Sequence, residues 1–82
     1  MMISTEDVRT LLQSEESNAI LVVVEGRVEV ISAGRLASAD YRGALEVAAR
    51  DDLVQRIGEA PSDREIEEQA AQLDTAVSEL GG

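Results

Sequence analysis

The sequence predicts a small α+β domain, in which one antiparallel β-hairpin is packed by helices and an amphipathic C-terminal helix follows. Residues 19–33, AILVVVEGRVEVISA, contain two β-branched runs that meet at Glu25-Gly26, as is typical of a tight hairpin. The remaining apolar residues have helical spacing, and the hairpin is the only strand signal. We therefore expect a helix–hairpin–helix domain over residues 1–58 and a helical arm over residues 59–82.

The first expected element is a helix from Ser4 to Ser14. Ser4 is a suitable N-cap, and Glu6 and Asp7 lie near the positive end of the helix dipole. A polar loop over residues 14–18, SEESN, then leads into the hairpin. The apolar face of this helix is short and consists of Val8, Leu11 and Leu12.

The two-residue loop at Glu25-Gly26 determines the register of the hairpin. Because an isolated hairpin is marginally stable in water, its apolar face requires cover from helices or from a partner. That face holds the opposed pairs Val23–Val28 and Leu21–Val30. The other face combines charged and apolar residues, namely Arg27, Glu29, Val22 and Val24.

A second helix is expected to begin at a cap at Ser38 or Asp40 and to run toward Ile57. The acidic pair at residues 51–52 also suits a fresh helix N-terminus, so two short helices remain an alternative. Gly58 is suited to follow the last helical residue. The expected apolar stripe recurs every four residues, at Leu45, Ala49, Leu53 and Ile57.

The last helix is expected to open at Pro61-Ser62, where Ser62 and Glu65 match a capping box. Gly81-Gly82 is interpreted as the helix end rather than as the tail of a ubiquitin-like carrier, because the preceding residues are helical. The helix carries a short heptad-like seam at Ile66, Ala70, Leu73, Val77 and Leu80.

Composition excludes several classes of function. The net charge of −10, with seven arginines and no lysine, favours solubility and opposes bulk attraction to DNA. The charge is −3 over residues 1–42 and −7 over residues 43–82, so the C-terminal half, which contains the arm, is the more acidic part. Without cysteine or histidine there are no disulfides, no thiolate ligands and no imidazole base, so we expect no enzyme, no cofactor and no metal site.

Three further signals have ordinary interpretations. Paired acids, for example at residues 15–16 and 67–68, are interpreted as solvated surface, because none has the spacing of a cation-binding loop. The longest apolar run, residues 19–24, is too short to span a membrane and no signal peptide is apparent, so a cytoplasmic location is expected. Four dispersed arginines more often form surface ion pairs than a basic patch, namely Arg9, Arg27, Arg35 and Arg42.

Three segments resemble Phd/YefM-type antitoxins. Residues 3–12, ISTEDVRTLL, resemble the family's opening, in which a capped helix carries an acidic residue and then an arginine. The hairpin AILVVVEGRVEVIS resembles its central hairpin with a Gly-Arg turn, and residues 38–46, SADYRGALE, resemble its following helix. The resemblance covers residues 2–50, although residues 22–24 are valines where the family usually has basic residues or threonine.

The resemblance implies a dimeric antitoxin that contacts operator DNA through Arg9 and Arg27. It also implies a basic toxin as partner, bound in a groove by the apolar seam of the arm. A homodimer is expected as well because the apolar face of the hairpin exceeds what two short helices cover. The alternative is a protein-interaction or oligomerisation module that binds no DNA and whose arm packs on its own body. The implied toxin-binding residues are Ile66, Leu73, Val77 and Leu80.

Overall fold

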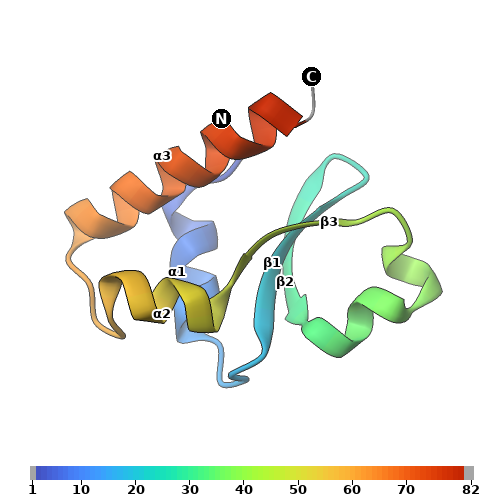
Figure 1. The fold of residues 1–82 in the computed structure, drawn as a ribbon, viewed down its shortest axis with the longest axis horizontal. Helices are drawn as coiled ribbons and strands as arrows, with labels where there is room; N and C mark the ends of the chain where they lie inside the picture. Colours follow the sequence, from blue (N-terminus) through green and yellow to red (C-terminus); the bar gives the residue numbers. More distant parts are fainter. Residues whose placement is uncertain (1, 81–82) are drawn as a thin grey trace.

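A three-stranded antiparallel sheet lies between three α-helices and two short 3₁₀ helices in this computed structural model, which describes residues 2–80 (Figure 1). The α+β class with a C-terminal helix is therefore confirmed. The strands stand in the order β2-β1-β3, so β1 is central. The elements are α1 (Thr5–Gln13), β1 (Ala19–Val24), β2 (Arg27–Ser32), η1 (Ala33–Ala37), η2 (Ala39–Tyr41), β3 (Leu45–Ala49), α2 (Arg50–Ile57) and α3 (Asp63–Leu80).

The hairpin of β1 and β2 has the predicted register. Val23 lies opposite Val28, and Leu21 lies opposite Val30. Glu25 and Gly26 form the loop with φ values of 50° and 78°. Two successive residues with positive φ give the turn a twist that matches the right-handed twist of the flanking strands.

The predicted helix over residues 38–57 is wrong in its first part, and so is the claim of a single strand signal. Residues 45–49 form β3, which pairs with the second edge of β1. A spacing of four residues is also a multiple of the two-residue strand period, so the stripe fits either structure. Ser38 precedes only the short η2, with which its side chain forms no capping hydrogen bond. Of the two short helices expected as the alternative, the second is confirmed by α2, whereas residues 45–49 of the first form a strand.

The predicted helix ends are confirmed by their caps. Ser4 and Asp7 form a capping box on α1, with the Ser4 amide donating to Asp7 Oδ2 over 2.9 Å. At the start of α3, the Ser62 amide donates to Glu65 Oε1 over 3.1 Å and the Glu65 amide donates to Ser62 Oγ. Gly58 closes α2 at a φ of 80°, where a glycine avoids the strain that other residues meet.

The main core lies between the sheet and the three α-helices. It draws on both parts of the chain, because α3 contributes four of its buried residues. Helix α3 therefore packs on the body of its own chain. The buried residues of this core are Ile3, Val8, Leu11, Leu12, Ala19, Leu21, Leu53, Ile66, Ala70, Leu73 and Val77.

The opposite face of the sheet has a smaller core. Val22 is fully buried and Ile20 and Ile31 nearly so, under a cover that includes Leu36 of η1 and Tyr41 of η2. Val22 and Val24, which share this face with Arg27 and Glu29, are thus buried by protein rather than exposed to water. Leu21, on the other face, is fully buried within a single chain, so the hairpin needs no second copy to cover its centre.

Candidate functional site

Arg9, a predicted DNA contact, joins two helices of the protein. Its guanidinium donates to Asp63 Oδ1 at the start of α3 over 2.9 Å and to Glu6 Oε1 of α1 over 3.1 Å. These two bonds, the one to Asp63 foremost, raise the pKa of Arg9 above its usual value. A phosphate would therefore have to compete with two carboxylates for this guanidinium.

Arg27, the second predicted DNA contact, is held in the same way at the tip of the hairpin. It forms ion pairs with Glu29 and with Glu25, the latter over 3.2 Å. The hydrogen bonds to these two carboxylates raise its pKa. Arg27 is thus a member of surface ion pairs, as expected from the sequence for dispersed arginines.

The structure does not bring Arg9 and Arg27 together. Arg27 is two residues from Glu29, which lies opposite Val22, so both charges are on the face covered by the 3₁₀ helices. Helix α1, which carries Arg9, packs on the other face beside Leu21. Two arginines on opposite sides of a sheet make no shared patch within one chain.

The residues predicted to bind a toxin lie in the protein's own core. Ile66, Leu73 and Val77 are 5%, 7% and 9% exposed, and all three pack in the main core. Leu80 ends α3, but its side chain lies outside the described residues, as do Gly81 and Gly82. The seam is therefore closed against the body in this conformation.

One polar residue interrupts that seam. Gln69 is 8% exposed, and its Oε1 atom is buried without a hydrogen-bond donor. A buried carbonyl oxygen without a donor destabilises a folded state by about 1–3 kcal/mol. The packing of α3 on the body thus includes one unfavourable contact among its apolar ones.

A polar cluster that sequence reasoning missed links β2 to η2. The Tyr41 hydroxyl donates to Glu29 Oε1 over 2.9 Å, and the guanidinium of Arg35 lies 5.6 Å from the centre of the Tyr41 ring. The hydrogen bonds from Arg27 and Tyr41 lower the pKa of Glu29, while the bond to Glu29 raises the pKa of Tyr41. The one signal for this cluster was that Tyr41 is the sole aromatic residue.

A second missed contact ties the N-terminal segment to α3. Asp74 Oδ1 accepts hydrogen bonds from the amides of Met2, over 2.7 Å, and Ile3, over 3.0 Å. The bonds from Ile3 and Met2 lower the pKa of Asp74. This carboxylate holds the chain start in place and allows Ile3 to be fully buried. No local sequence pattern signals a contact between residues so far apart in the chain.

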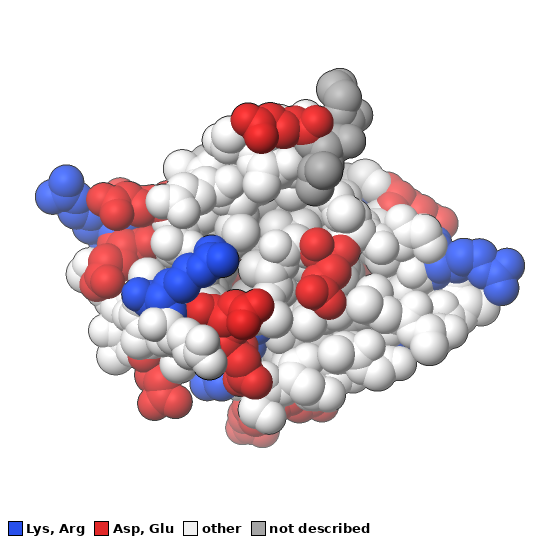
Figure 2. Space-filling view, viewed as in Figure 1, with Lys and Arg blue, Asp and Glu red and all other residues white. Residues whose placement is uncertain are grey.

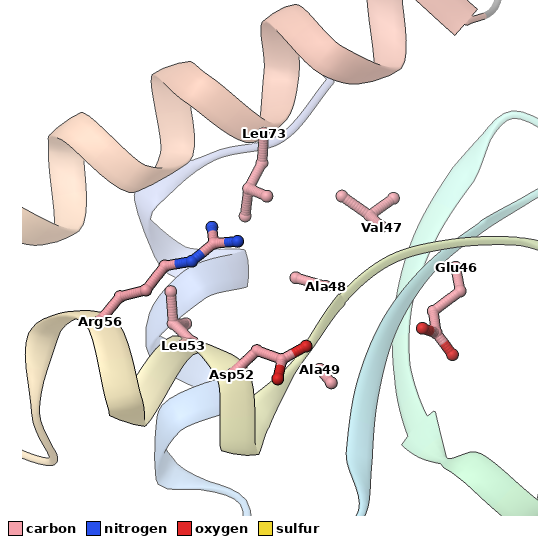
Figure 3. A pocket seen from close by; sticks show the side chains of 8 residues that line it. All are labelled: Glu46, Val47, Ala48, Ala49, Asp52, Leu53, Arg56 and Leu73. Atoms are coloured by element: carbon pink, nitrogen blue, oxygen red, sulfur yellow. The ribbon is translucent and has the colours of Figure 1, made fainter.

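The outer edge of β3 lies beside a hollow of about 100 Å³ (Figure 3). Figure 3 shows Leu73 pointing down from α3 and Arg56 reaching from α2 toward it, with Val47 and Ala48 of β3 beside them. Leu45, on the same strand, is 36% exposed and belongs to the few large apolar side chains at the described surface. The hollow is lined by Glu46, Val47, Ala48, Ala49, Asp52, Leu53, Arg56 and Leu73.

Neither a metal centre nor a membrane-spanning element emerges from the described part of the chain. Within residues 2–80, acidic side chains form no group of three that is suited to hold a metal ion. Over the same residues, every helix is too short or too polar to cross a bilayer. The edge of β3, with the exposed Leu45 and the hollow beside it, is a candidate site for binding another polypeptide segment.

Comparisons of this chain with protein-family models, with curated proteins and with solved structures found no match.

Proposed function

We propose that this protein is a non-enzymatic protein-interaction module that acts as one preformed body. The observation that carries the proposal is the open edge of β3, which adjoins a hollow and an exposed leucine, Leu45. An edge strand offers unpaired backbone groups to a second chain, and side-chain pockets beside it add selectivity. The lack of histidine and cysteine agrees with a binding role rather than a catalytic one.

The ion pairs of the two arginines support a function that does not involve DNA binding. Arg9 and Arg27 are each engaged by two carboxylates, and they lie on opposite sides of the sheet. Phosphate contacts from either arginine would have to break these ion pairs against a net charge of −10. We expect no saturable DNA binding at moderate salt.

The module is tested by photo-crosslinking in the cells in which the protein naturally occurs. A photo-reactive amino acid is placed in turn at exposed positions of every element, such as Leu45 on β3, Glu67 on α3 and Thr10 on α1. A protein-interaction module yields an adduct of discrete mass with another protein at one group of positions. If no position yields such an adduct, the proposal is wrong.

The antitoxin remains a second candidate function, and Gln69 is the observation that favours it. The side-chain oxygen of Gln69 is buried without a hydrogen-bond donor, and this lowers the free energy needed to separate α3 from the core. Release would expose the seam of Ile66, Leu73 and Val77 for the groove of a basic toxin. In this second function, α3 has a closed and an open state.

Amide hydrogen exchange on the free protein distinguishes the two candidates. A preformed body requires protection of residues 63–79 comparable to that of β1, because helix and strand then open together. Fast exchange confined to α3 would favour the antitoxin and would overturn the preformed body. Sedimentation of the same sample tests the homodimer, which stays a prediction.

A further inference from the structure

We propose that the outer edge of β3 takes up an extended, basic segment of a partner protein as a fourth strand of the sheet. The inference rests on the proposed function as an interaction module and names its site and the chemistry of its partner. The required partner segment places a lysine or arginine opposite Glu46 and small apolar residues on either side of it.

The register of β3 determines what such a strand meets on each face. Leu45 lies opposite Val23 and therefore faces the helical side, whereas Glu46 lies opposite Val22 and faces the 3₁₀ side. Successive side chains of an added strand also alternate between the two faces. The residue opposite Glu46 thus meets a carboxylate, and its two neighbours meet the helical side.

The hollow on the helical side accepts a small apolar side chain. Val47 and Ala48 pack against the main core there, and Leu73 of α3 and Leu53 of α2 add to the apolar part of its lining. The charged part of the lining consists of Glu46, Asp52 and Arg56. Figure 3 shows these side chains converging from three elements. The volume of the hollow, about 100 Å³, suits a valine or alanine side chain rather than an aromatic ring.

Charge selects a basic segment at Glu46, which faces the 3₁₀ side and also borders the hollow at the edge of the sheet. Glu46 is exposed, and no side chain among residues 2–80 forms an ion pair with it, in contrast to Glu29 on β2, which Arg27 and Tyr41 engage. Opposite charges directly across a strand pair are stabilising, and like charges are destabilising. Figure 2 shows that acidic and basic side chains on this side of the molecule are scattered over a largely uncharged surface.

The same features favour a basic partner over a second copy of this chain as the occupant. Each copy carries a net charge of −10, and pairing of two β3 edges about Glu46 would place two carboxylates opposite each other. The strand is also short, and its pairing with β1 is irregular between Leu21 and Val22. Edge strands that are short, charged and irregular resist pairing with their own copies. A partner strand with a basic residue opposite Glu46 replaces the charge repulsion by attraction.

The test is a titration of the full ¹⁵N-labelled chain with two short synthetic peptides, followed by NMR. One peptide has a lysine between two valines, and the matched peptide has a glutamate in place of the lysine. We expect the lysine peptide to shift the amides of β3 and α2 and to bind about 3- to 10-fold more tightly than the glutamate peptide.

The charge-reversed variant Glu46→Lys gives the decisive comparison. It should invert the preference in favour of the glutamate peptide, whereas Glu67→Lys, the same change on the exposed face of α3, should leave the preference intact. Equal affinity for both peptides, an unchanged preference in Glu46→Lys, or shifts confined to other elements would each overturn the β3 site.

Failure of this site is distinguishable from failure of the proposed function. Photo-crosslinked adducts that form at α1 or α3 but not at Leu45 would leave the interaction module standing and refute the β3 edge as its site. If no position yields an adduct, both proposals fail together. Adducts confined to Leu45 and its neighbours support both.

Discussion

The two faces of the sheet are covered by different means. On one face three α-helices bury a continuous aliphatic core, in which Leu21 and Leu11 have no exposed surface. On the other face two 3₁₀ helices cover a small cluster, and a chain of polar contacts from Arg27 through Glu29 to Tyr41 links them to β2. The first cover depends on area removed from water, and the second depends more on specific hydrogen bonds.

The two faces are therefore expected to differ in how much they contribute to stability and in how strongly that contribution depends on pH. Burial of aliphatic area is insensitive to pH and weakly directional, so the helical face is expected to supply most of the folding free energy. Exposed ion pairs and hydrogen bonds contribute little each, but they respond to protonation. Substitutions on the helical face should therefore have large effects, and those on the 3₁₀ face smaller and pH-dependent ones.

The largest expected effect is that of Ala70→Asp on the helical face. Ala70 is 1% exposed within the main core, so a carboxylate there would be buried without a partner. We expect a loss of about 3–5 kcal/mol in the free energy of unfolding, measured by urea denaturation. Ala71→Asp, the same change at the next and exposed position, is the control and should be close to neutral. A small effect for both would mean that α3 does not pack on the body.

The next comparison sets Leu21→Ala against Ile31→Ala. Truncation of Leu21, which is fully buried among helices on a rigid strand, should cost about 2–5 kcal/mol. Ile31 lies under the short 3₁₀ cover, which has more freedom to collapse into a cavity, so its truncation should fall near the lower end of that range. Equal losses in chemical denaturation would contradict the contrast between the faces.

The sequence predicted local features of the fold well. The Glu25-Gly26 loop, the cap at Ser4 and the capping box of Ser62 and Glu65 depend on neighbouring residues, and all three are confirmed. Strand β3 was missed because its residues are compatible with both helix and strand. What decides between them is the unpaired second edge of β1, a strand that lies more than 20 residues away in the chain.

The candidate site was less accessible to sequence reasoning for the same reason. The local ion pairs of Arg9 with Glu6 and of Arg27 with Glu29 follow from spacing. The bond from Arg9 to Asp63 joins residues 54 positions apart, and no local pattern reports it. The hollow beside β3 likewise requires β3 to exist and α3 to close over it.

A stabilising substitution sharpens the comparison. Gln69→Leu removes the buried oxygen that has no donor and replaces it with a residue suited to the apolar seam. We expect the free energy of unfolding to rise by about 1 kcal/mol, because the desolvation penalty of that oxygen is lost. Gln72→Leu, at an exposed position of the same helix, should give no comparable gain. In amide exchange, Gln69→Leu should also slow the opening of α3, and its failure to do so would remove the support for a released arm.

The smallest expected effect lies on the 3₁₀ face and depends on pH. The hydrogen bonds from Arg27 and Tyr41 lower the pKa of Glu29 in the folded state, so the folded state favours the ionised carboxylate. The stability from this group is present above the ordinary glutamate pKa of about 4.3, and it is lost as the pH falls through the lowered value.

Tyr41→Phe removes one of the two bonds, so the pKa of Glu29 should move back toward its ordinary value and the acid limb of the stability curve should become less steep. An NMR titration of the Glu29 carboxyl carbon measures this shift directly. The Arg9 pairs on the other side of the sheet are the internal control, because Tyr41→Phe should leave their signals unchanged. A Glu29 pKa that does not move would show that Arg27 alone holds the carboxylate and that the cover formed by η2 does not depend on it.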